Sequence, residues 1–412
     1  MTGAVDAAPR ARIDLLDALR GVALLGIFLM NVEWFSRPLQ ELGMGPPAGA
    51  DALDAALGWG IYALVQGKFW VLFSLLFGMS FAAMEAARPG AGFTPMLLRR
   101  LGLLAVFGIA HALLLWPGDI LLAYALAGLG LLVFRSIDAR LLAGVGIAFY
   151  MAMALMGLLG SLMMVAAPDA MAETLDGLAA AREAGISRGE VYASGGFAAV
   201  TRARMQDFAA VTLAGLGNTP STLGVFLIGV WVFRSGLLAA RDSHQHVLRW
   251  MAGLGLCIGA PLVAVGTWRA MQAPDGDIPA QYVALSIMLL GNLPLALAWL
   301  ALLARGLAAP AARRLRAALA PAGRMALTNY LMQSLIASLV FHGYGLGLWG
   351  QVGRAGQCAL VIVVFAAQLL LSRWWLTRFA YGPVEWLWRA GTRLAWPPFR
   401  RDPGGGAYTA GA

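Results

Sequence analysis

The sequence predicts an all-α membrane protein that crosses the bilayer about ten times. Hydrophobic residues make up 60% of the 412 residues and charged residues only 12%, and the mean hydropathy is +0.73. Soluble domains average about 25% charged residues, so a water-soluble chain of this size could not bury so much apolar surface. The basic residues also stand in short clusters between long apolar runs, which is typical of a polytopic membrane protein.

Ten apolar stretches have the length that a membrane span requires, which is roughly 20 residues in helical form. They comprise residues 18–35, 66–86, 97–116, 118–134, 141–166, 208–233, 248–268, 281–304, 325–342 and 356–377. The first stretch follows several arginines but precedes no small-residue cleavage site, so we expect it to remain as an anchor.

The positions of the basic residues predict the orientation of these spans. With the N-terminus in the cytoplasm and strict alternation, most of the 30 lysines and arginines fall in cytoplasmic segments. The outer side then holds only Arg37, Lys68, Arg182, Arg188, Arg202, Arg204, Arg269 and Arg354. This asymmetry follows the positive-inside rule and predicts that both termini are cytoplasmic.

We expect four parts along the chain: a cytoplasmic segment over 1–17, a membrane bundle over 18–207, a second membrane domain over 208–395 and a disordered tail over 396–412. The first bundle carries two long outer loops. Residues 36–65 predict a turn followed by a helix at the membrane interface. Residues 167–207 are rich in charge, which fits either a water-exposed helical hairpin or a plain solvated loop.

Several classes of function lack their signatures. The two cysteines, Cys257 and Cys358, lie in apolar runs and are expected to be free thiols. Four histidines and no zinc-type cysteine spacing predict no metal site. The chain has no phosphate-binding P-loop, no H-E-x-x-H and no G-x-S-x-G motif. Because topology accounts for the basic excess, we expect membrane lipid as a partner and no nucleic acid.

One titratable pair stands out in the stretch FGIAHALLLWPGDILLAY, residues 107–124. His111 lies near the end of an apolar run, and Asp119 opens the next run after the Pro117–Gly118 break. Asp119 could simply cap a helix, and His111 could simply bond a neighbouring helix. An ionisable group within a span is costly, however, and tends to face a cavity, and histidine suits proton transfer near neutral pH. These interpretations both stay open.

A second motif is RIDLLDALRGVALLGIFLMN, residues 12–31, at the inner mouth of the first span. Asp17 and Arg20 are three residues apart and share a helix face. Arg20 is either a topology anchor in a surface ion pair or a fixed guanidinium that binds phosphate or carboxylate.

Small and polar residues mark two further spans. In QGKFWVLFSLLFGMSFA, residues 66–82, Ser74 and Gly78 predict close helix packing, and Lys68 is expected to extend toward water. In GRMALTNYLMQSLIASLVFHGYG, residues 323–345, Asn329 and Gln333 share a face. They either bond a neighbouring helix or line a cavity. His342 is expected to face water at the outer end.

Together these stretches resemble a known family. The segments LDALRGVALLGIFLMN, FSLLFGMSF, RRLGLLAVFGIAHALLLWPGDILLAYAL, GRMALTNYLMQS and YGPVEWLWR occur in the order typical of the YeiB-like family of bacterial inner-membrane proteins. Residues 225–395 resemble the domain of unknown function numbered 418. This family is similar to the transmembrane acyltransferase superfamily, which includes the acyltransferase-3 proteins and the lysosomal heparan-glucosaminide N-acetyltransferase.

The resemblance implies a multi-pass protein of the bacterial inner membrane, a cytosolic acyl-CoA donor and an acceptor on the far side of the membrane. It also implies an intramembrane histidine that acts as base or transient acyl carrier. Carried over to this sequence, the motifs assign the histidine to His111, its partner to Asp119 and a donor contact to Arg20. Apart from the resemblance, Arg99 and Arg100 are candidates for the donor because they are basic and lie on the predicted cytoplasmic side, and Asn329 and Gln333 are candidates for the substrate because they share a polar face.

Three hypotheses follow from the sequence. The leading one is an acyltransferase-like enzyme that moves an acyl group from acyl-CoA to a small-molecule or glycan acceptor. The second is a small-solute transporter or exporter that uses His111 and Asp119 as a proton relay. The third is a scaffold protein in which His111 only joins helices. Self-association into a homo-oligomer is left open.

Overall fold

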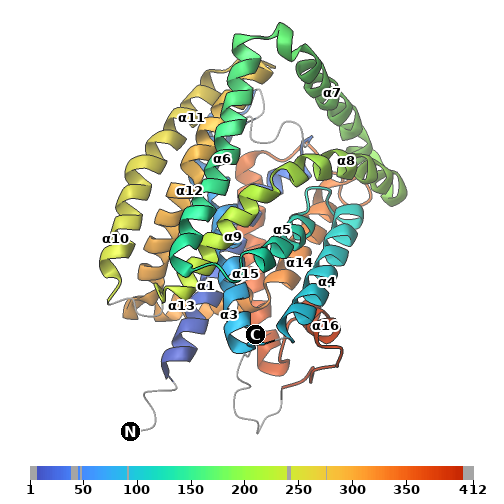
Figure 1. Ribbon diagram of the computed structural model, residues 1–412. Helices are drawn as coiled ribbons and strands as arrows, with labels where there is room; N and C mark the ends of the chain where they lie inside the picture. Colours follow the sequence, from blue (N-terminus) through green and yellow to red (C-terminus); the bar gives the residue numbers. More distant parts are fainter. Residues whose placement is uncertain are drawn as a thin grey trace.

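The computed structural model describes residues 7–38, 45–46, 49–90, 92–238, 243–274 and 276–401. Within these residues the chain is all-α, as predicted, and a single isolated bridge between Phe379 and Arg400 is the only β-type pairing. Long helices run side by side and form an elongated bundle (Figure 1).

The longer helices account for most of the described chain. They are α1 Ala7–Asn31, α2 Ala52–Leu64, α3 Lys68–Ala87, α4 Phe93–Leu114, α5 Leu121–Val133, α6 Ala139–Ala166, α7 Ala172–Ser194, α8 Phe197–Gly217, α9 Thr219–Arg234, α10 Gln245–Leu254, α11 Ala260–Gln272, α12 Ile278–Ala308, α13 Arg313–Arg324, α14 Ala326–Phe341, α15 Arg354–Arg378 and α16 Pro383–Arg393. Short turns join several of them: η1 Val32–Phe35, η3 Asp169–Met171, η4 Gly255–Gly259 and η5 Pro310–Ala312.

Seven helical segments among the described residues are long and apolar enough to cross a membrane. The count becomes eight if α8 and α9, which meet at a bend of 55°, form one span. Two of the predicted spans, 118–134 and 325–342, correspond to α5 and α14, which have only 13 and 16 residues. The protein is therefore a multi-pass membrane protein, but the predicted count of ten is not confirmed, because these two helices are shorter than a typical span.

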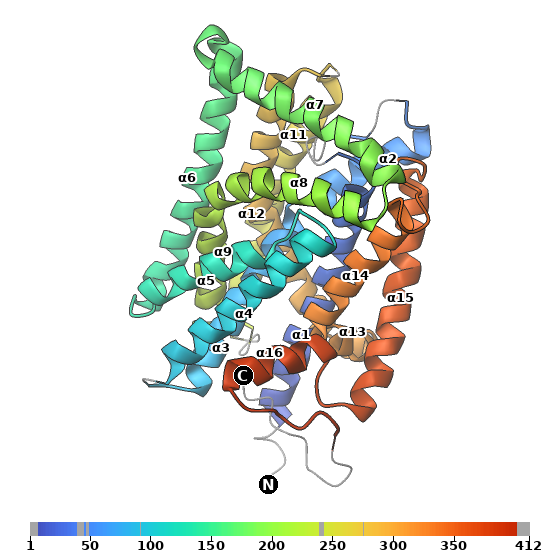
Figure 2. The ribbon, with the colours of Figure 1, turned by 90° about the vertical axis from the view of Figure 1, so that its right-hand side faces the viewer.

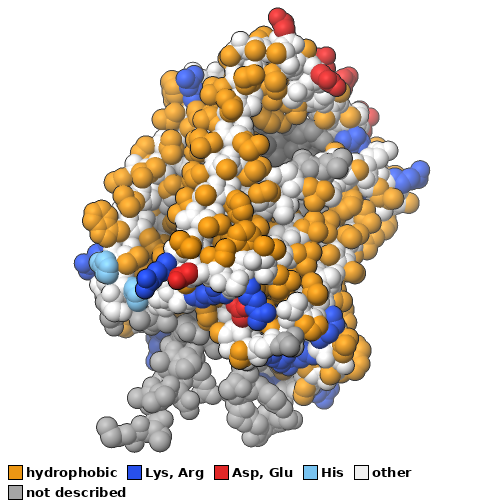
Figure 3. Space-filling view, in the orientation of Figure 1, with side chains coloured by type: hydrophobic (Ala, Val, Ile, Leu, Met, Phe, Trp, Pro, Cys, Tyr) orange, Lys and Arg blue, Asp and Glu red, His pale blue; other side chains and the backbone are white. Residues whose placement is uncertain are grey.

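The two ends of the bundle differ in charge. The start of α1, α13 and α16 lie together at one end, which we call the basic end, and α2 and α7 lie at the opposite end (Figure 2). Basic side chains gather toward the basic end of the face in Figure 3, and acidic side chains stand at the far corner above α6. At the basic end, Glu85 in the last turn of α3 accepts hydrogen bonds from Arg135 and, at 2.9 Å, from Arg234.

The two predicted outer loops contain helices. The first ends in α2, which confirms the helix expected there, although residues 39–44 and 47–48 lie outside the described part. The second is a helical hairpin of α7 and α8 rather than a plain loop (Figure 2).

At the basic end, residues 396–401 pack on α15 and α16, since Trp386 Nε1 donates to the Pro397 carbonyl and Ala380 N to the Phe399 carbonyl. The predicted tail therefore does not begin at 396, and 402–412 lie outside the described residues.

Close glycine contacts hold the centre of the bundle together. A Cβ on Gly78 of α3 would overlap the backbone oxygen of Phe226 in α9, as the small-residue pattern predicted. On the other side of α9, a Cβ on Gly224 would lie 2.5 Å from the backbone oxygen of Gly146 in α6. Since lipid tails are as apolar as leucine, such close packing rather than hydrophobicity drives helices together in a membrane.

We expect Gly78→Ala to destabilise the folded protein by about 1–3 kcal/mol, because the added methyl group must push α3 away from α9. The matched control is Gly102→Ala in α4, where nothing lies within 4 Å of the new methyl group. That variant should be neutral or slightly stabilised by its better helix propensity. Thermal unfolding in detergent measures both, and an equal effect of the two substitutions would contradict the packing described.

Candidate functional site

His111 and Asp119 form a buried pair, as the sequence placed them. The end of α4 and the turn after Trp116 bring the Nδ1 atom of His111 within 2.8 Å of Asp119 Oδ1. The other carboxylate oxygen, Oδ2, accepts a hydrogen bond of 2.8 Å from the backbone N–H of Leu122 in the first turn of α5. Asp119 therefore does two things at once: it caps α5 and it orients the imidazole ring. The capping role expected for Asp119 is therefore present, and its role in proton transfer stays a prediction.

The His111 ring has one nitrogen left over. Its Nε2 atom is buried and makes no hydrogen bond within the described part of the chain. Because Asp119 accepts from Nδ1–H, the free Nε2 atom is the one that can accept a proton. The ring packs on Tyr330 of α14, with centroids 5.0 Å apart, and on Trp116 at 6.3 Å. The Tyr330 hydroxyl is also buried without a partner.

Gly108 allows this arrangement, because it lies one turn before His111 on α4. A Cβ there would stand 2.6 Å from Asp119 Oδ2 and 2.5 Å from the Leu122 nitrogen. Any larger residue would force the carboxylate away from the ring.

A cavity of about 430 Å³ extends from the basic end toward this pair. On α3 its lining runs from Ala87 back to Phe73, a rise of about 21 Å along the helix. Its inner end is formed by Ile120, Tyr124 and Tyr330. His111 and Asp119 do not line the cavity themselves. One layer of side chains, Tyr330 and Ile120, separates them from it.

Charged residues surround the mouth of the cavity, and apolar ones line its interior. The basic lining residues are Arg20, Arg100, Arg324 and Arg389, and the acidic ones are Asp17 and Glu385. The apolar interior includes Leu24, Ile27, Phe73, Phe77, Leu104 and Leu121. A cavity with this distribution of polarity suits a ligand that has an anionic head and an apolar or neutral extension.

The four arginines differ in their partners. Arg20 forms an ion pair with Asp17 and donates to Ser80 Oγ at 2.7 Å. Arg100 stacks over the ring of Trp388, with 3.6 Å from the guanidinium carbon to the ring centroid. Arg324 and Arg389 make no ion pair or side-chain hydrogen bond with any described residue, although Arg389 lies over the ring of Tyr381. Arg100, Arg324 and Arg389 thus form no ion pair with a described carboxylate, although Asp17 acts electrostatically on Arg324 and Glu385 on Arg389.

Helix α16 supplies part of this mouth. Its Glu385 accepts hydrogen bonds from the backbone nitrogen and hydroxyl of Thr328, at 2.9 and 2.6 Å, and so fixes α16 to the start of α14. Burial raises the pKa of the Glu385 carboxyl group, and burial together with the neighbouring Arg393 lowers the pKa of Arg389.

Three of the predicted site residues lie away from the cavity. Arg99 points to α16, where its Nε atom donates to the Thr392 carbonyl at 3.0 Å. Asn329 donates to Ser372 Oγ at 3.0 Å, and Gln333 to the side chain of Gln368 at 2.8 Å. The two amides therefore join α14 to α15, which is the first of the two arrangements that the sequence left open. A substrate contact for either stays a prediction.

Two expectations about outer residues are wrong. His342 is buried rather than exposed to water. Its Nδ1 atom accepts a hydrogen bond of 2.8 Å from Arg204, which is buried beside it. Burial and the charge of Arg204 lower the pKa of His342 to about 3, so its ring is neutral at physiological pH. Lys68 does not extend to water either, since its buried ammonium group donates to the Tyr62 carbonyl at 2.9 Å.

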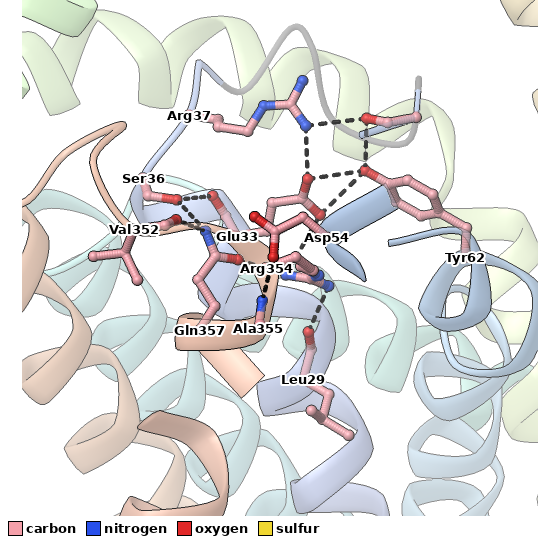
Figure 4. A network of polar contacts seen from close by, with 11 residues as sticks. Leu29, Glu33, Ser36, Arg37, Asp54, Tyr62, Val352, Arg354, Ala355 and Gln357 are labelled. Carbon is pink, nitrogen blue, oxygen red and sulfur yellow. Dashed lines mark hydrogen bonds and ion pairs between the residues drawn. The ribbon is translucent and has the colours of Figure 1, made fainter. Parts of the chain in front are cut away.

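A polar network that the sequence did not reveal closes the end opposite the basic end (Figure 4). Glu33 of η1 accepts from Arg37 at 2.6 Å and from the Tyr62 hydroxyl at 3.0 Å, and it lies 3.6 Å from Arg354. Gln357 of α15 donates to Ser36 Oγ at 3.0 Å. The network ties η1, α2 and α15 together around one buried carboxylate.

Sequence reasoning also missed Tyr330, Arg324 and Arg389. Tyr330 lies between Asn329 and Gln333, and a single tyrosine in an apolar helix carries no sequence signal that sets it apart from core packing. Arg324 and Arg389 were counted only as topology signals. Within the described residues no group of three or more histidine, cysteine or acidic side chains could hold a metal ion.

The fold and this buried site define a class of protein: an all-α, multi-pass membrane protein with a histidine–carboxylate pair that lies one layer of side chains beyond the inner end of a cavity with arginines at its mouth. Residues 232–395 match the family described as Protein of unknown function (DUF418). The chain is 34% identical to Uncharacterized protein YeiB of Escherichia coli (strain K12), over 93% of this chain and 97% of that one. It is 32% identical to Uncharacterized protein YxaH of Bacillus subtilis (strain 168), over 95% and 96%. The chain therefore belongs to the YeiB-like DUF418 family, as its motifs predicted.

A third relative extends the same similarity. It is the Uncharacterized 39.9 kDa protein in amylase 3'region of Bacillus acidopullulyticus, which is 28% identical over 92% of this chain and 93% of its own length. No solved structure matches the chain.

We expect Asp119→Ala to destabilise the protein more than the loss of an ordinary helix cap. The matched control is Asp138→Ala, because Asp138 caps α6 through the backbone nitrogen of Arg140 and has no ring partner. Loss of a cap costs about 1 kcal/mol, and leaving the buried His111 Nδ1–H unpaired adds about 1–3 kcal/mol. Denaturant unfolding in detergent should separate the two variants, and equal losses would argue against the buried pair.

Proposed function

We propose that this protein is a membrane acyltransferase that moves an acyl group from acyl-CoA to an acceptor on the far side of the membrane. The observation that carries the proposal is the cavity, which has arginines at its mouth and ends one side chain away from His111. The names of the relatives state no activity, so the proposal depends on this geometry and on the resemblance in sequence to the acyltransferase superfamily.

The donor would bind with its phosphates at the mouth and its acyl thioester inside. Arg100, Arg324 and Arg389 are not engaged in ion pairs with described carboxylates, and guanidinium groups bind phosphate oxygens well because their N–H groups match them in geometry. The volume of about 430 Å³ is within the range of pockets that hold small ligands. The apolar interior suits the neutral acyl and pantetheine portion.

The chemistry would take place at His111. Its free Nε2 atom removes the proton from an acceptor hydroxyl or amine, and the acceptor then attacks the thioester carbonyl carbon. The carbon–sulfur bond breaks, and the imidazolium returns its proton to the departing thiolate. Asp119 holds the ring in the required tautomer and stabilises its positive charge during the step. Movement of the Tyr330 side chain would open His111 to the cavity.

The orientation follows from charge. The basic end carries the start of α1, α13 and α16, and the positive-inside rule places such an end in the cytoplasm. The cavity mouth then faces cytosolic acyl-CoA, and the opposite end faces the acceptor. Because the relatives are bacterial proteins, we propose the bacterial inner membrane as the location.

A single set of variants tests the scheme with the purified protein and labelled acetyl-CoA. We expect His111→Ala to reduce acyl transfer by about 10²–10⁴-fold, as expected for loss of a general base, while donor binding stays unchanged. We expect Arg324→Gln to weaken donor binding by about 10-fold or more, since a hydrogen bond to a charged group contributes about 1.5–3 kcal/mol. Scintillation counting of the labelled acceptor measures transfer, and equilibrium dialysis measures binding.

The matched control is Arg314→Gln, an exposed arginine on the same helix α13 that does not line the cavity. It should affect neither quantity. Absence of donor binding, or binding that Arg314→Gln weakens as much as Arg324→Gln does, would overturn the proposal. Proton-coupled solute flux that requires His111 without any acyl transfer would instead favour the transporter hypothesis.

A further inference from the structure

The cavity ends at the start of helix α5. Ile120, the last residue before α5, and Leu121, its first residue, both line the inner end of the cavity. Backbone N–H groups at the start of a helix have no partner within the helix, and the helix dipole makes this end favourable for negative charge. The N–H of Leu122 donates to Asp119 Oδ2, whereas those of Ile120 and Leu121 donate to no acceptor among the described residues.

A tyrosine hydroxyl group without a partner lies at the same place. Tyr330 of α14 lines the cavity and is only 5% exposed, and its hydroxyl group is buried with no hydrogen bond to any described residue. Asp119 and the backbone of Ile120 both act on this hydroxyl group electrostatically, so it lies beside the start of α5. A buried hydroxyl group without a partner is unfavourable, and an acceptor atom at the end of the cavity would satisfy it.

We propose that the Tyr330 hydroxyl group and the backbone N–H of Ile120 form an oxyanion site, which binds the thioester carbonyl oxygen of the acyl donor. This site rests on the proposed function, since it adds a catalytic group to the same acyl transfer. Oxyanion sites consist of donors that converge on the atom where negative charge develops. When the ring of Tyr330 turns from His111 to admit the thioester, its hydroxyl group meets the carbonyl oxygen.

The carbonyl oxygen carries negative charge only during part of the reaction. His111 Nε2 takes the proton of the acceptor hydroxyl or amine, and the acceptor atom forms a bond to the carbonyl carbon. The π electrons of the carbonyl group move to its oxygen, which accepts hydrogen bonds from Tyr330 and Ile120. The double bond then forms again, the carbon–sulfur bond breaks, and the imidazolium protonates the departing thiolate. Tyr330 keeps its own proton throughout.

The carboxylate of Asp119 is compatible with this role. Its negative charge alone would oppose an oxyanion beside Tyr330. Both of its oxygens are engaged, however, with His111 Nδ1 and with the Leu122 N–H, each at 2.8 Å. His111 holds the transferred proton while the oxyanion exists, so the imidazolium balances the charge of Asp119 during that part of the reaction.

The first test measures acyl transfer by the full-length protein in nanodiscs of phosphatidylcholine, from labelled acetyl-CoA to an extract of the bacterial cell envelope. We expect Tyr330→Phe to lower kcat about 10²–10³-fold with an unchanged KM for the donor, as for loss of one oxyanion donor. The matched control is Tyr150→Phe. Tyr150 of α6 is also fully buried and donates to the Leu289 carbonyl at 2.8 Å, but it does not line the cavity, so both constants should stay unchanged.

The second test needs no acceptor. Acetonyl-CoA has a methylene group between its sulfur and its carbonyl group, so it binds without transferring the acyl group. We expect the infrared band of its isotope-labelled carbonyl group to move to lower wavenumber on binding, because hydrogen bonds weaken the carbon–oxygen double bond. Tyr330→Phe should lose most of this shift, and Tyr150→Phe should retain it. Replacement of Tyr330 by a fluorotyrosine, a stronger donor of the same shape, should enlarge the shift and serves if Tyr330→Phe does not fold.

The two tests separate the oxyanion site from the enzyme. Acyl transfer that is equally fast in Tyr330→Phe and Tyr150→Phe would overturn the oxyanion site and leave the acyltransferase in place. Equal carbonyl shifts in these two variants would also overturn the site. A shift that depends on Tyr330, without acyl transfer to the extract, would support the site and count against the acyltransferase. Failure of acetonyl-CoA to bind the wild-type protein would overturn both.

Discussion

The architecture depends on one constraint: the membrane interior offers no water, so each polar group inside the bundle must find a partner in the protein or face a cavity. Asp119 meets this constraint by dividing its two oxygens between His111 and the first turn of α5. The result is a rigid, oriented imidazole whose remaining nitrogen, Nε2, is unused. An unused proton acceptor in such a place suits proton transfer, which is the role we propose for His111.

The same constraint explains where the charges gather. At the basic end, arginines line the mouth of a cavity whose interior is apolar, and at the opposite end Glu33 collects two arginines and a tyrosine into one closed network. Arg204 is the exception, since its partners are all neutral.

Much of this could be predicted from the sequence, and the limits have physical causes. Apolar length and arginine placement gave the fold class, and the Pro117–Gly118 break brought Asp119 to His111, because both signals are local. The burial of a side chain depends on residues far away in the sequence. His342 follows the end of a helix and was expected in water, yet it is buried against Arg204, which lies 138 residues away. The role of Tyr330 was equally hidden, since only the packing of α14 against the cavity places it beside His111.

The central claim is that the cavity carries an acyl donor to His111. The most direct measurement is a density map of the protein in nanodiscs with a non-hydrolysable thioether analogue of acetyl-CoA. We expect density for the phosphates of the analogue between Arg324 and Arg389 and continuous density from there along α3. We also expect the carbonyl group of the analogue beside Tyr330, and the ring of Tyr330 turned away from His111. An analogue bound elsewhere, with lipid chains filling the cavity, would contradict it.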